Sequence, residues 1–332
     1  MTSRSRYKAV ILDNVFKDYD IEEEILRQAG CTLAVADPES ESEMISLVSD
    51  ADAVIVNLHQ INENVISTMI KCRIISRYGV GFDNVDIAAA ARFGIWVSNV
   101  PDYCIEETSD HAIALLASCA RNISRKDRCI RNGKWKMEHG CQSLRIAGKT
   151  LGIIGYGKVG RAVHRKLSGW DLDHVLVHDP YIKAEELSGK HVRIVPLQTL
   201  IRESDFITIH TPLTPETHHL IGRHELAMMK KTAIIINTAR GKIIDEAALV
   251  EALASGKIMG AGLDVYETEP LPGNSPLCAT ENVVLTNHTA YHSGESEIEL
   301  KTLSALNVAE TLCNGKPMYP VNSVAIPACG KM

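Results

Sequence analysis

Residues 150–160 carry the pattern that most constrains what this chain can fold into. Leu151–Ile154 is a short run of mostly branched apolar residues, which predicts a buried strand of a parallel sheet. Gly155, Gly157 and Gly160 then form the pattern Gly-x-Gly-x-x-Gly. In such a turn the first glycine permits a tight bend, the second lets the backbone approach a pyrophosphate, and the third lets a helix pack closely on the strand. The pattern therefore predicts a strand–turn–helix unit that can hold phosphates.

The residues that follow supply the remaining parts of a dinucleotide-binding unit. Arg161–Leu167 is compatible with a helix whose N-terminus would face the phosphates, and His174–His178 predicts the second strand. Asp179 ends that strand, nineteen residues after Gly160. An acid at this place can accept hydrogen bonds from a ribose and would repel a 2′-phosphate, so we predict NAD (NADH) rather than NADP as the cofactor. A Gly-rich turn without a ligand is the alternative, but it explains neither the second strand nor the acid.

Composition narrows the class of protein. With 332 residues, 45% hydrophobic and 23% charged, the chain has the size of two globular domains with cores of their own. The net charge of −6 and the absence of a long basic run argue against nucleic acid or an anionic membrane as a partner. The nine cysteines are odd in number and form no Cys-x-x-Cys pair, which favours reduced thiols in the cytoplasm over disulfides or a metal site. No signal peptide or membrane span is expected.

Strand and helix signals alternate through most of the chain. The further predicted strands are Tyr7–Leu12, Thr32–Ala36, Ala53–Asn57, Ile74–Ser76, Phe206–His210, Ala233–Asn237, Gly260–Asp264 and Val283–Thr286. The further predicted helices are Ile21–Ala29, Glu41–Val48, Asn64–Lys71, Val85–Phe93, Arg223–Met229, Asp245–Ala254 and Glu295–Cys313. Such alternation predicts α/β domains with parallel sheets and helices on their faces.

Three segments interrupt this alternation. Residues 105–124 run from acidic to basic around an apolar middle, which predicts one long buried helix suited to a domain hinge or a subunit contact. Residues 130–148 are polar and predict an irregular arm. Residues 317–332 contain prolines and predict a loosely ordered tail.

Three polar residues, Arg240, Glu269 and His288, each come shortly after a predicted strand, at the edge where open α/β sheets bind their ligands. Hydride transfer at a carbinol carbon needs a proton acceptor matched to neutral pH, and a histidine suits that role. A carboxylate beside the imidazole would orient it, and a guanidinium can polarise a carbonyl and pair with a substrate carboxylate. Taken singly, they could be a surface arginine, a solvated glutamate and a structural histidine. Their shared position beside a dinucleotide motif favours a set for 2-keto acid reduction.

Four stretches resemble signatures of the D-isomer-specific 2-hydroxyacid dehydrogenases. They are Ser204–Leu220, Met229–Asp245, Gly262–Pro270 and Asn287–Ala290. The resemblance is specific for the family and weak for the substrate. It implies an NAD-dependent enzyme that interconverts a small 2-keto acid and the D-2-hydroxy acid.

The resemblance also implies roles for individual residues. The family's catalytic arginine falls on Arg240, its glutamate on Glu269 rather than Glu267, and its acid–base histidine on His288. The implied cofactor contacts are Gly155, Tyr156, Gly157, Lys158, Val159, Gly160, Asp179, Thr211, Pro212, Thr238, Ala239, Arg240, Asp264, His288 and Ala290. The implied substrate contacts are Arg77, Tyr78, Gly79, Val80 and Tyr291. The first four belong to a loop whose backbone amides hold the substrate carboxylate in the family; for Arg77 a surface salt bridge is the alternative.

The sequence departs from the family in one position and points to a branch of it in another. Asn287 stands where the family usually has a proline before the histidine, which would shift that loop slightly. Tyr291 matches an aromatic position of the branch that includes the C-terminal-binding-protein corepressors, and it could line the substrate pocket.

We therefore predict an α/β protein with two Rossmann-like domains, each a doubly wound parallel sheet, and a cleft between them. Residues 105–292 would form the NAD-binding Rossmann domain, and residues 1–104 with 293–332 a flavodoxin-like substrate-binding domain. The family implies a homodimer formed through the NAD-binding domain. A non-catalytic, NAD(H)-sensing protein like the corepressors is the alternative, against which the complete Arg, Glu and His set argues. A formate-oxidising relative would carry Gln in place of Glu269, and a lyase with bound NAD has no support in these signatures.

Overall fold

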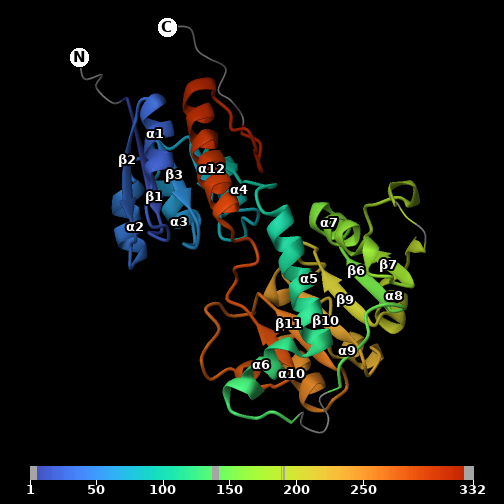
Figure 1. Cartoon of the computed structure of the whole chain (residues 1–332). Helices are drawn as coiled ribbons and strands as arrows, with labels where there is room; N and C mark the ends of the chain where they lie inside the picture. Colours follow the sequence, from blue (N-terminus) through green and yellow to red (C-terminus); the bar gives the residue numbers. More distant parts are fainter. Residues whose placement is uncertain (1–5, 137–141, 188, 190, 325–332) are drawn as a thin grey trace. The chain divides into compact units, whose positions relative to one another are not determined.

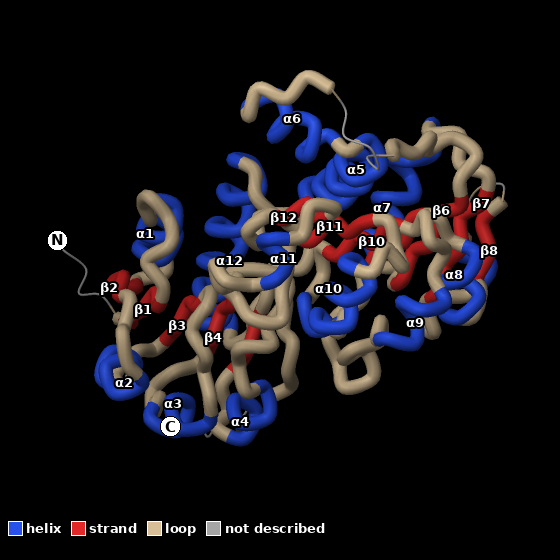
Figure 2. Tube along the Cα trace, turned by 90° about the horizontal axis from the view of Figure 1, so that it is seen from below, coloured by secondary structure: helices blue, strands red, loops and turns tan. Residues whose placement is uncertain are grey.

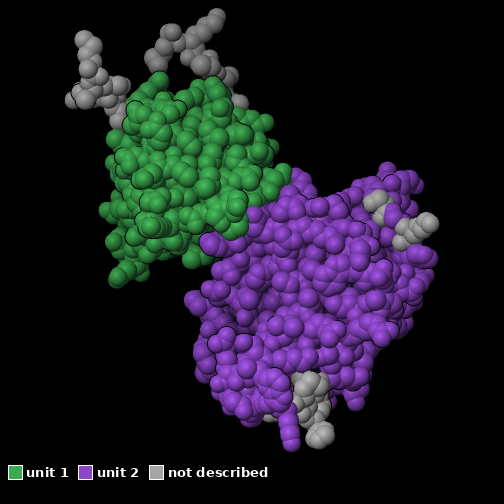
Figure 3. Space-filling model, in the orientation of Figure 1, with its two compact units in different colours: residues 1–103, 293–332 green, residues 104–292 purple. Residues whose placement is uncertain are grey.

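The computed structural model describes residues 6–136, 142–187, 189 and 191–324. The chain forms two compact units, which Figure 3 shows in different colours. Unit 1 comprises Met1–Tyr103 and Ser293–Met332, and unit 2 comprises Cys104–His292. Each is built on one parallel sheet, so the predicted α/β class is confirmed.

Unit 1 contains five parallel strands in the order β2-β1-β3-β4-β5. Its elements are β1 (Tyr7–Leu12), α1 (Asp20–Gln28), β2 (Cys31–Ala36), α2 (Glu41–Val48), β3 (Ala53–Val56), α3 (Glu63–Thr68), β4 (Ile74–Arg77), α4 (Ile87–Arg92), β5 (Trp96–Ser98) and α12 (Gly294–Asn314). Figure 2 shows α2, α3 and α4 along one face of this sheet. On the other face α1 and α12 pack side by side (Figure 1). Because both faces are covered, β1 and β3 are nearly continuous apolar runs.

The segment after α12 is held against the edge strand β5. Val321 N donates to the Val97 carbonyl over 2.9 Å. The Asn322 side chain accepts from Val97 N over 2.9 Å and donates to the Ile95 carbonyl over 2.9 Å. An edge strand has unpaired backbone groups, and this segment pairs them. The prediction of a loosely ordered tail is therefore wrong for residues 317–324, and the rest of that tail lies outside the described residues.

Unit 2 contains seven parallel strands in the order β12-β11-β10-β9-β6-β7-β8. Its elements are α5 (Ile105–Arg121), α6 (Ile123–Arg131), β6 (Thr150–Ile154), α7 (Lys158–Lys166), β7 (His174–His178), β8 (Val192–Ile194), α8 (Leu197–Glu203), β9 (Phe206–Ile209), α9 (Arg223–Met228), β10 (Ile234–Asn237), α10 (Glu246–Ala254), β11 (Gly260–Leu263), α11 (Pro276–Ala279) and β12 (Val283–Leu285). In Figure 2, α5 and α7 lie on one face of the sheet and α8, α9 and α10 on the other. The strand order reverses between β6 and β9, and open α/β sheets bind ligands at the carboxyl ends of such strands.

The long helix predicted at residues 105–124 is two helices in the structure. Asn122 adopts the left-handed conformation, with φ 55°, which ends α5 and begins α6. Its side chain donates to the Gln142 carbonyl over 2.9 Å, outside either helix. Asparagine tolerates this conformation better than most residues, and the charge gradient of the sequence continues smoothly across the break. Part of the predicted irregular arm, residues 130–131, therefore belongs to α6.

Candidate active site

The Gly-rich turn between β6 and α7 has the close backbone contacts that the motif predicts. Gly155 has φ 87°, and a Cβ there would lie 2.7 Å from the backbone of His210. A Cβ on Gly160 would lie 2.3 Å from the carbonyl oxygen of Gly155. Gly157 faces open space and is the N-cap of α7, so it has no side chain to cap the first turn. The turn thus offers helix-end amides to an anion, as a dinucleotide pyrophosphate requires.

Asp179 follows β7 and braces the same turn. Its Oδ2 accepts from Tyr156 N over 2.8 Å, and its Oδ1 accepts from Tyr181 N over 2.9 Å. The carboxylate is half-buried at the carboxyl edge of the sheet. It therefore places a negative charge beside the Gly-rich turn while fixing the backbone of Tyr156, one of the predicted cofactor contacts.

A buried hydroxyl lies at the end of β10. Within the described residues, Thr238 Oγ1 has no hydrogen-bond partner. The flanking backbone is rigid, because the Asn237 side chain accepts from Ala239 N over 3.0 Å and donates to the Arg240 carbonyl over 2.9 Å. Buried hydroxyl groups without a partner are rare in folded proteins, and a bound polar ligand would satisfy this one. The Gly-rich turn, Asp179 and Thr238 together fit a dinucleotide.

Thr211 and Pro212 follow β9, the neighbour of β10 in the sheet. The adjacent His210 is hydrogen-bonded through Nε2 to Thr208 Oγ1 over 2.8 Å. Burial lowers the pKa of His210 to about 3, so its imidazole is neutral at physiological pH. This histidine is therefore unsuited to donate a proton, although it lies at the same edge of the sheet as the predicted catalytic set.

His288 and Glu269 come together although they are nineteen residues apart. His288 Nδ1 lies 2.5 Å from Glu269 Oε2, and the other oxygen, Oε1, accepts from Tyr266 N over 2.9 Å. The imidazole is about two-fifths exposed, so solvent or a substrate can reach it. A histidine bonded through Nδ1 to a carboxylate has its tautomer and ring orientation fixed, which leaves Nε2 for proton transfer.

The electrostatics of Glu269 favour its charged form. Burial acts to raise the pKa of this carboxyl, but the hydrogen bond and charge of His288, the Tyr266 amide and the charge of Arg240 outweigh it and lower the pKa. Arg240 follows β10, and its Nη1 donates to the Ala239 carbonyl over 2.8 Å. Arg240 is thus one of the charges that act on Glu269, together with His288.

The loop that carries His288 is held by hydrogen bonds to the buried carboxylate of Asp264. Asp264 Oδ1 accepts from Thr289 N over 3.0 Å, and Oδ2 accepts from Ala290 N over 2.8 Å. His288 N donates to the Asp264 carbonyl over 2.8 Å, and His288 has φ 56°. Asn287, which replaces the usual proline, accepts from the Thr289 hydroxyl over 3.0 Å. The loop with Asn287 therefore still brings His288 to Glu269.

Sequence reasoning missed the support beneath this loop. Thr286 Oγ1 donates to Asp264 Oδ1 over 2.6 Å and lies 2.9 Å from Nε2 of His111, which comes from α5. The Tyr266 hydroxyl donates to the Thr286 carbonyl over 2.6 Å. The available signal was a histidine directly before the apolar middle of the predicted helix, but its partner, Thr286, lies 175 residues away in the sequence.

In unit 1, the loop after β4 is the predicted binding place of the substrate carboxylate. Tyr78 is only 1% exposed, and its hydroxyl donates to Glu22 Oε1 over 2.6 Å, so its side chain anchors the loop rather than facing solvent. Tyr78 N and Gly79 N donate to backbone carbonyls of Val56 and Arg77. For the amides of the next two residues, 80 and 81, no acceptor is found among the residues that the structure describes. These two amides are the ones that the predicted carboxylate site would use.

Tyr291, the other predicted substrate contact, follows the His288 loop. It is half-buried and packs edge-to-face on His292, with 6.2 Å between ring centroids.

Within the described residues, no helix is long and apolar enough to cross a membrane. No group of three or more His, Cys, Asp or Glu side chains in that part of the chain could hold a metal ion.

Known proteins resemble this chain over nearly its whole length. Residues 113–290 match the family model of the D-isomer specific 2-hydroxyacid dehydrogenase, NAD binding domain. The chain is 42% identical to a glyoxylate reductase of Korarchaeum cryptofilum over 275 residues, 82% of each protein. It is 38% identical to a D-3-phosphoglycerate dehydrogenase of Archaeoglobus fulgidus over 305 residues, which is 91% of this chain and 57% of that protein.

A solved structure resembles both units. The NADPH-dependent glyoxylate/hydroxypyruvate reductase of Sinorhizobium meliloti, in complex with NADP and malonate, superposes with a TM-score of 0.85. The match covers 97% of this chain and all of that one, with 27% sequence identity.

Proposed function

Because the chain belongs to the D-isomer-specific 2-hydroxyacid dehydrogenase family, we propose that it reduces a small 2-keto acid to the D-2-hydroxy acid with NADH, and catalyses the reverse reaction with NAD. The family assignment confirms the resemblance seen in the sequence, and it makes the protein an enzyme that uses a nicotinamide cofactor. The choice of acid, the choice of NADH over NADPH and the residue roles below are parts of the proposal.

The pair of His288 and Glu269 carries the proposal. When bound, the nicotinamide supplies a hydride to C2 of the keto acid. Protonated His288 donates the proton to the developing alkoxide, and Glu269 stabilises the imidazolium before that step through the 2.5 Å contact. Arg240 polarises the carbonyl of the substrate. In the reverse direction the same imidazole accepts the hydroxyl proton, so each direction balances in protons.

Glyoxylate is the acid we propose to test first. The glyoxylate reductase from Korarchaeum cryptofilum is 42% identical to this chain over 82% of its length. The substrate carboxylate would bind the amides of Val80 and Gly81, with Arg77 as a further cation nearby. A substrate pocket distinguishes acids by only about 1–3 kcal/mol per methylene, so close homologues with different acids are expected.

Asp179 supports NADH over NADPH. Its carboxylate is fixed by two backbone amides at the end of β7, where the ribose of a dinucleotide lies in this class of sheet. A 2′-phosphate there would meet a like charge. The solved reductase from Sinorhizobium meliloti is NADPH-dependent, so both cofactors must be measured.

Two further features belong to the proposal. We propose a homodimer formed through unit 2, for which the exposed Ile123, Ile130 and Trp135 on and after α6 offer apolar surface; sedimentation of the purified protein tests it. We also propose a cytoplasmic location, in keeping with the seven cysteines in the described residues, all of which are free thiols.

The test is the oxidation of NADH with a panel of 2-keto acids: glyoxylate, hydroxypyruvate, phosphohydroxypyruvate, pyruvate and 4-methyl-2-oxopentanoate. We expect turnover of at least one acid. The product should be the D-isomer for every acid of the panel except glyoxylate, whose product, glycolate, is achiral. His288→Asn should lower kcat by about 10²–10⁴-fold, while His224→Asn, an exposed histidine on α9, serves as the matched control and should have normal kinetics. Tight NADH binding without turnover of any acid would favour the NAD(H)-sensing alternative, and normal turnover by His288→Asn would refute the role of His288.

A further inference from the structure

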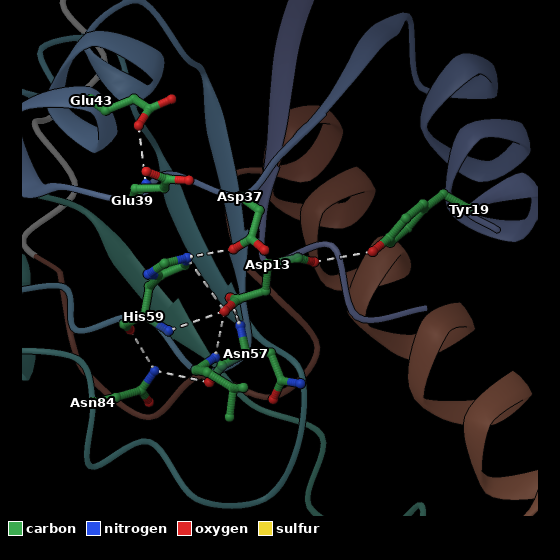
Figure 4. A network of polar contacts seen from close by, with 9 residues as sticks. Asp13, Tyr19, Asp37, Glu39, Glu43, Asn57, His59 and Asn84 are labelled. Atoms are coloured by element: carbon green, nitrogen blue, oxygen red, sulfur yellow. Dashed lines mark hydrogen bonds and ion pairs between the residues drawn. The ribbon is translucent and has the colours of Figure 1, made fainter. Parts of the chain in front are cut away.

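Unit 1, like unit 2, has a switch point at the carboxyl ends of its strands, the place where an open α/β sheet forms its ligand crevice. In the order β2-β1-β3-β4-β5, the connection after β1 passes to the face covered by α1 and α12, and the connection after β3 passes to the opposite face. The ends of β1 and β3 are therefore a switch point, where an open α/β sheet ordinarily binds a ligand. Figure 4 shows what lies there: the side chain of Asp13, surrounded by the loop that follows β3.

The carboxylate of Asp13 lies at this place, where a bound anionic ligand would otherwise lie. Its Oδ2 accepts from Asn57 N over 2.6 Å, and its Oδ1 accepts from Leu58 N over 3.0 Å and from His59 N over 3.2 Å. Successive backbone amides that converge in this way form an anion-binding nest. Asp13 is 3% exposed, so its carboxylate is enclosed by these amides rather than shared with solvent.

The backbone of Asp13 is also unusual. Its φ is 99°, a value that residues other than glycine rarely adopt. The conformation is held by three contacts: Asp13 N donates to the Ala36 carbonyl over 3.0 Å, Tyr19 donates to the Asp13 carbonyl over 3.1 Å, and the side chain binds the amides after β3. Strain of this kind persists where the surroundings over-determine it, which is common at functional sites.

The loop that Asp13 holds is in turn bonded to the loop after β4. Asn84 Nδ2 donates to the carbonyls of Asn57 and His59, over 3.0 and 2.8 Å. Ile61 N donates to the Asn84 carbonyl over 2.8 Å, and Tyr78 N donates to the Val56 carbonyl over 2.8 Å. Hydrogen bonds therefore run from Asp13 through residues 57–61 to residues 78–84, the segment that contains the proposed carboxylate-binding amides.

The imidazole of His59 lies between Asp13 and the exposed carboxylate of Asp37. Its Nε2 lies 3.1 Å from Asp37 Oδ1 and 3.7 Å from Asp13 Oδ1. Asp37 is exposed and touches the imidazole, whereas Asp13 holds the backbone. The backbone contacts thus depend on Asp13 and not on the histidine or the second acid.

We propose that Asp13 is a positioning residue for substrate binding: its carboxylate fixes the amides of residues 57–59, and through Asn84 it holds the 77–81 loop in the conformation that binds the substrate carboxylate. This inference rests on the proposed function for its kinetic consequence. Its structural part, the fixing of residues 57–59, does not depend on which substrate is bound.

The test uses Asp13→Asn in the full-length protein. Asparagine has the shape of aspartate and tolerates positive φ, but its NH₂ group faces amide N–H groups that need an acceptor. We expect KM for the keto acid to rise about tenfold or more, with kcat within about threefold of wild type and the Kd of NADH unchanged. Asp52→Asn is the matched control: Asp52 Oδ2 accepts from Lys8 N over 2.9 Å, joining the opposite ends of the same two strands. That variant should have the wild-type KM.

Hydrogen exchange of the backbone amides of residues 57–59, measured without substrate, separates the two parts of the inference. These amides should exchange faster in Asp13→Asn than in wild type, and normally in Asp52→Asn. If they do, but no 2-keto acid is turned over by wild type, the proposed function fails while the fixing of the loop stands. Unchanged exchange, or faster exchange with an unchanged KM, overturns the proposal.

A second variant keeps the proposal testable if Asp13→Asn folds poorly. Asp13→Gly relieves the backbone strain and leaves the three amides without their carboxylate. We expect this variant to have a raised KM for the keto acid, as Asp13→Asn does. Added formate should lower that KM by binding the amides of residues 57–59 in place of the missing carboxylate, whereas formate added to wild type should not lower KM. Failure of formate to lower the KM of Asp13→Gly would show that the carboxylate is not what the loop needs, and would also overturn the proposal.

Discussion

His288 depends on its backbone conformation as much as on its imidazole. Its φ of 56° turns the chain after β12, and the Asp264 carboxylate holds the two amides that follow. The ring then meets Glu269, whose second oxygen is bound to the Tyr266 amide. The loop of His288 is thus fixed by the side chain of Asp264, and the Glu269 carboxylate by the backbone amide of Tyr266. A substitution that kept the imidazole but released the loop would separate the pair.

Glu269→Gln tests the charge of that pair separately from its shape. The amide keeps a hydrogen-bond acceptor but stabilises a protonated imidazole less than a carboxylate does, so we expect kcat for reduction to fall about 10–100-fold. The pH profile for reduction should move to lower pH. Stopped assays of NADH oxidation from pH 5 to 9 measure both effects, with Glu267→Gln as the control, because Glu267 pairs with His219 instead. A profile unchanged from wild type would contradict the role given to Glu269.

The lowered pKa of Glu269 also has a consequence for stability. A carboxyl whose pKa is lower in the folded protein than in the unfolded chain stabilises the fold above its ordinary pKa of 4.5. This contribution is lost as the pH falls through the lowered value. Urea unfolding of wild type and Glu269→Gln should therefore show a difference at pH 6 that shrinks on acidification; a difference that grows would contradict the sign of this shift.

Cofactor choice is a second property that one residue should control. Asp179→Asn keeps an acceptor for the Tyr156 amide but removes the charge that opposes a 2′-phosphate. Two like charges about 4 Å apart repel by about 1–4 kcal/mol at the dielectric constants of a protein surface. We expect the ratio of kcat/KM for NADPH to that for NADH to rise about tenfold or more. A wild-type enzyme that already prefers NADPH would contradict the premise of this prediction, that Asp179 disfavours the 2′-phosphate.

At the scale of elements, the contact between the C-terminal segment and β5 should contribute measurably to stability. Asn322→Ala removes two hydrogen bonds to the backbone on either side of Trp96 in the edge strand, and we expect a loss of about 1–3 kcal/mol in the free energy of unfolding. Asn314→Ala should change it by less than about 0.5 kcal/mol, because the Asn314 side chain bonds to Glu310 on the same helix and to no other residue in the described part of the chain. Chemical denaturation followed by circular dichroism measures both. Equal effects of the two substitutions would mean that the segment does not protect the edge.

Which elements the sequence predicts follows from how each is stabilised. The buried strands are apolar runs, and β1 and β7 have the predicted bounds, Tyr7–Leu12 and His174–His178. The short edge strand β8 (Val192–Ile194) has no such run and was not predicted. The break at Asn122 and the binding of residues 317–324 to β5 depend on a single backbone conformation and on long-range pairing, which local patterns do not contain.

The residues of the candidate site also fall into those that local sequence patterns predict and those that they do not. Motif spacing and strand ends predicted Arg240, Glu269 and His288, because parallel strands bring their carboxyl ends to one edge. The supporting residues, His111 and Asp13, were not predicted, because each bonds to a segment far away in the sequence. The prediction for Tyr78 was incomplete: its backbone belongs to the loop, but its hydroxyl is buried against Glu22, which no local pattern reveals.

At the scale of the whole molecule, each of the two doubly wound sheets has a switch point at the carboxyl ends of its strands, and the two switch points are lined differently. In unit 2 the crevice at the end of β6 is lined by a Gly-rich turn that offers helix-end amides. In unit 1 the crevice at the end of β1 is filled by the carboxylate of Asp13, and the chain there has no Gly-x-Gly-x-x-Gly pattern. An internal anion on converging amides excludes an external one from the same place. The two units should therefore differ in whether they bind a dinucleotide, although both have the sheet for it.

This difference predicts the stoichiometry of cofactor binding. Isothermal titration of the full-length protein with NADH should give one site per chain, and saturation at 100 times Kd should stabilise the protein by about 2.7 kcal/mol in thermal unfolding. Gly160→Val should abolish that binding, because a side chain at this position would meet the carbonyl oxygen of Gly155 within 2.3 Å of its Cβ. Asp13→Asn should leave the stoichiometry and Kd unchanged, since its crevice lies in the other unit. Two sites per chain in wild type, or NADH binding that persists in Gly160→Val and is lost in Asp13→Asn, would show that the crevice of unit 1 binds the cofactor.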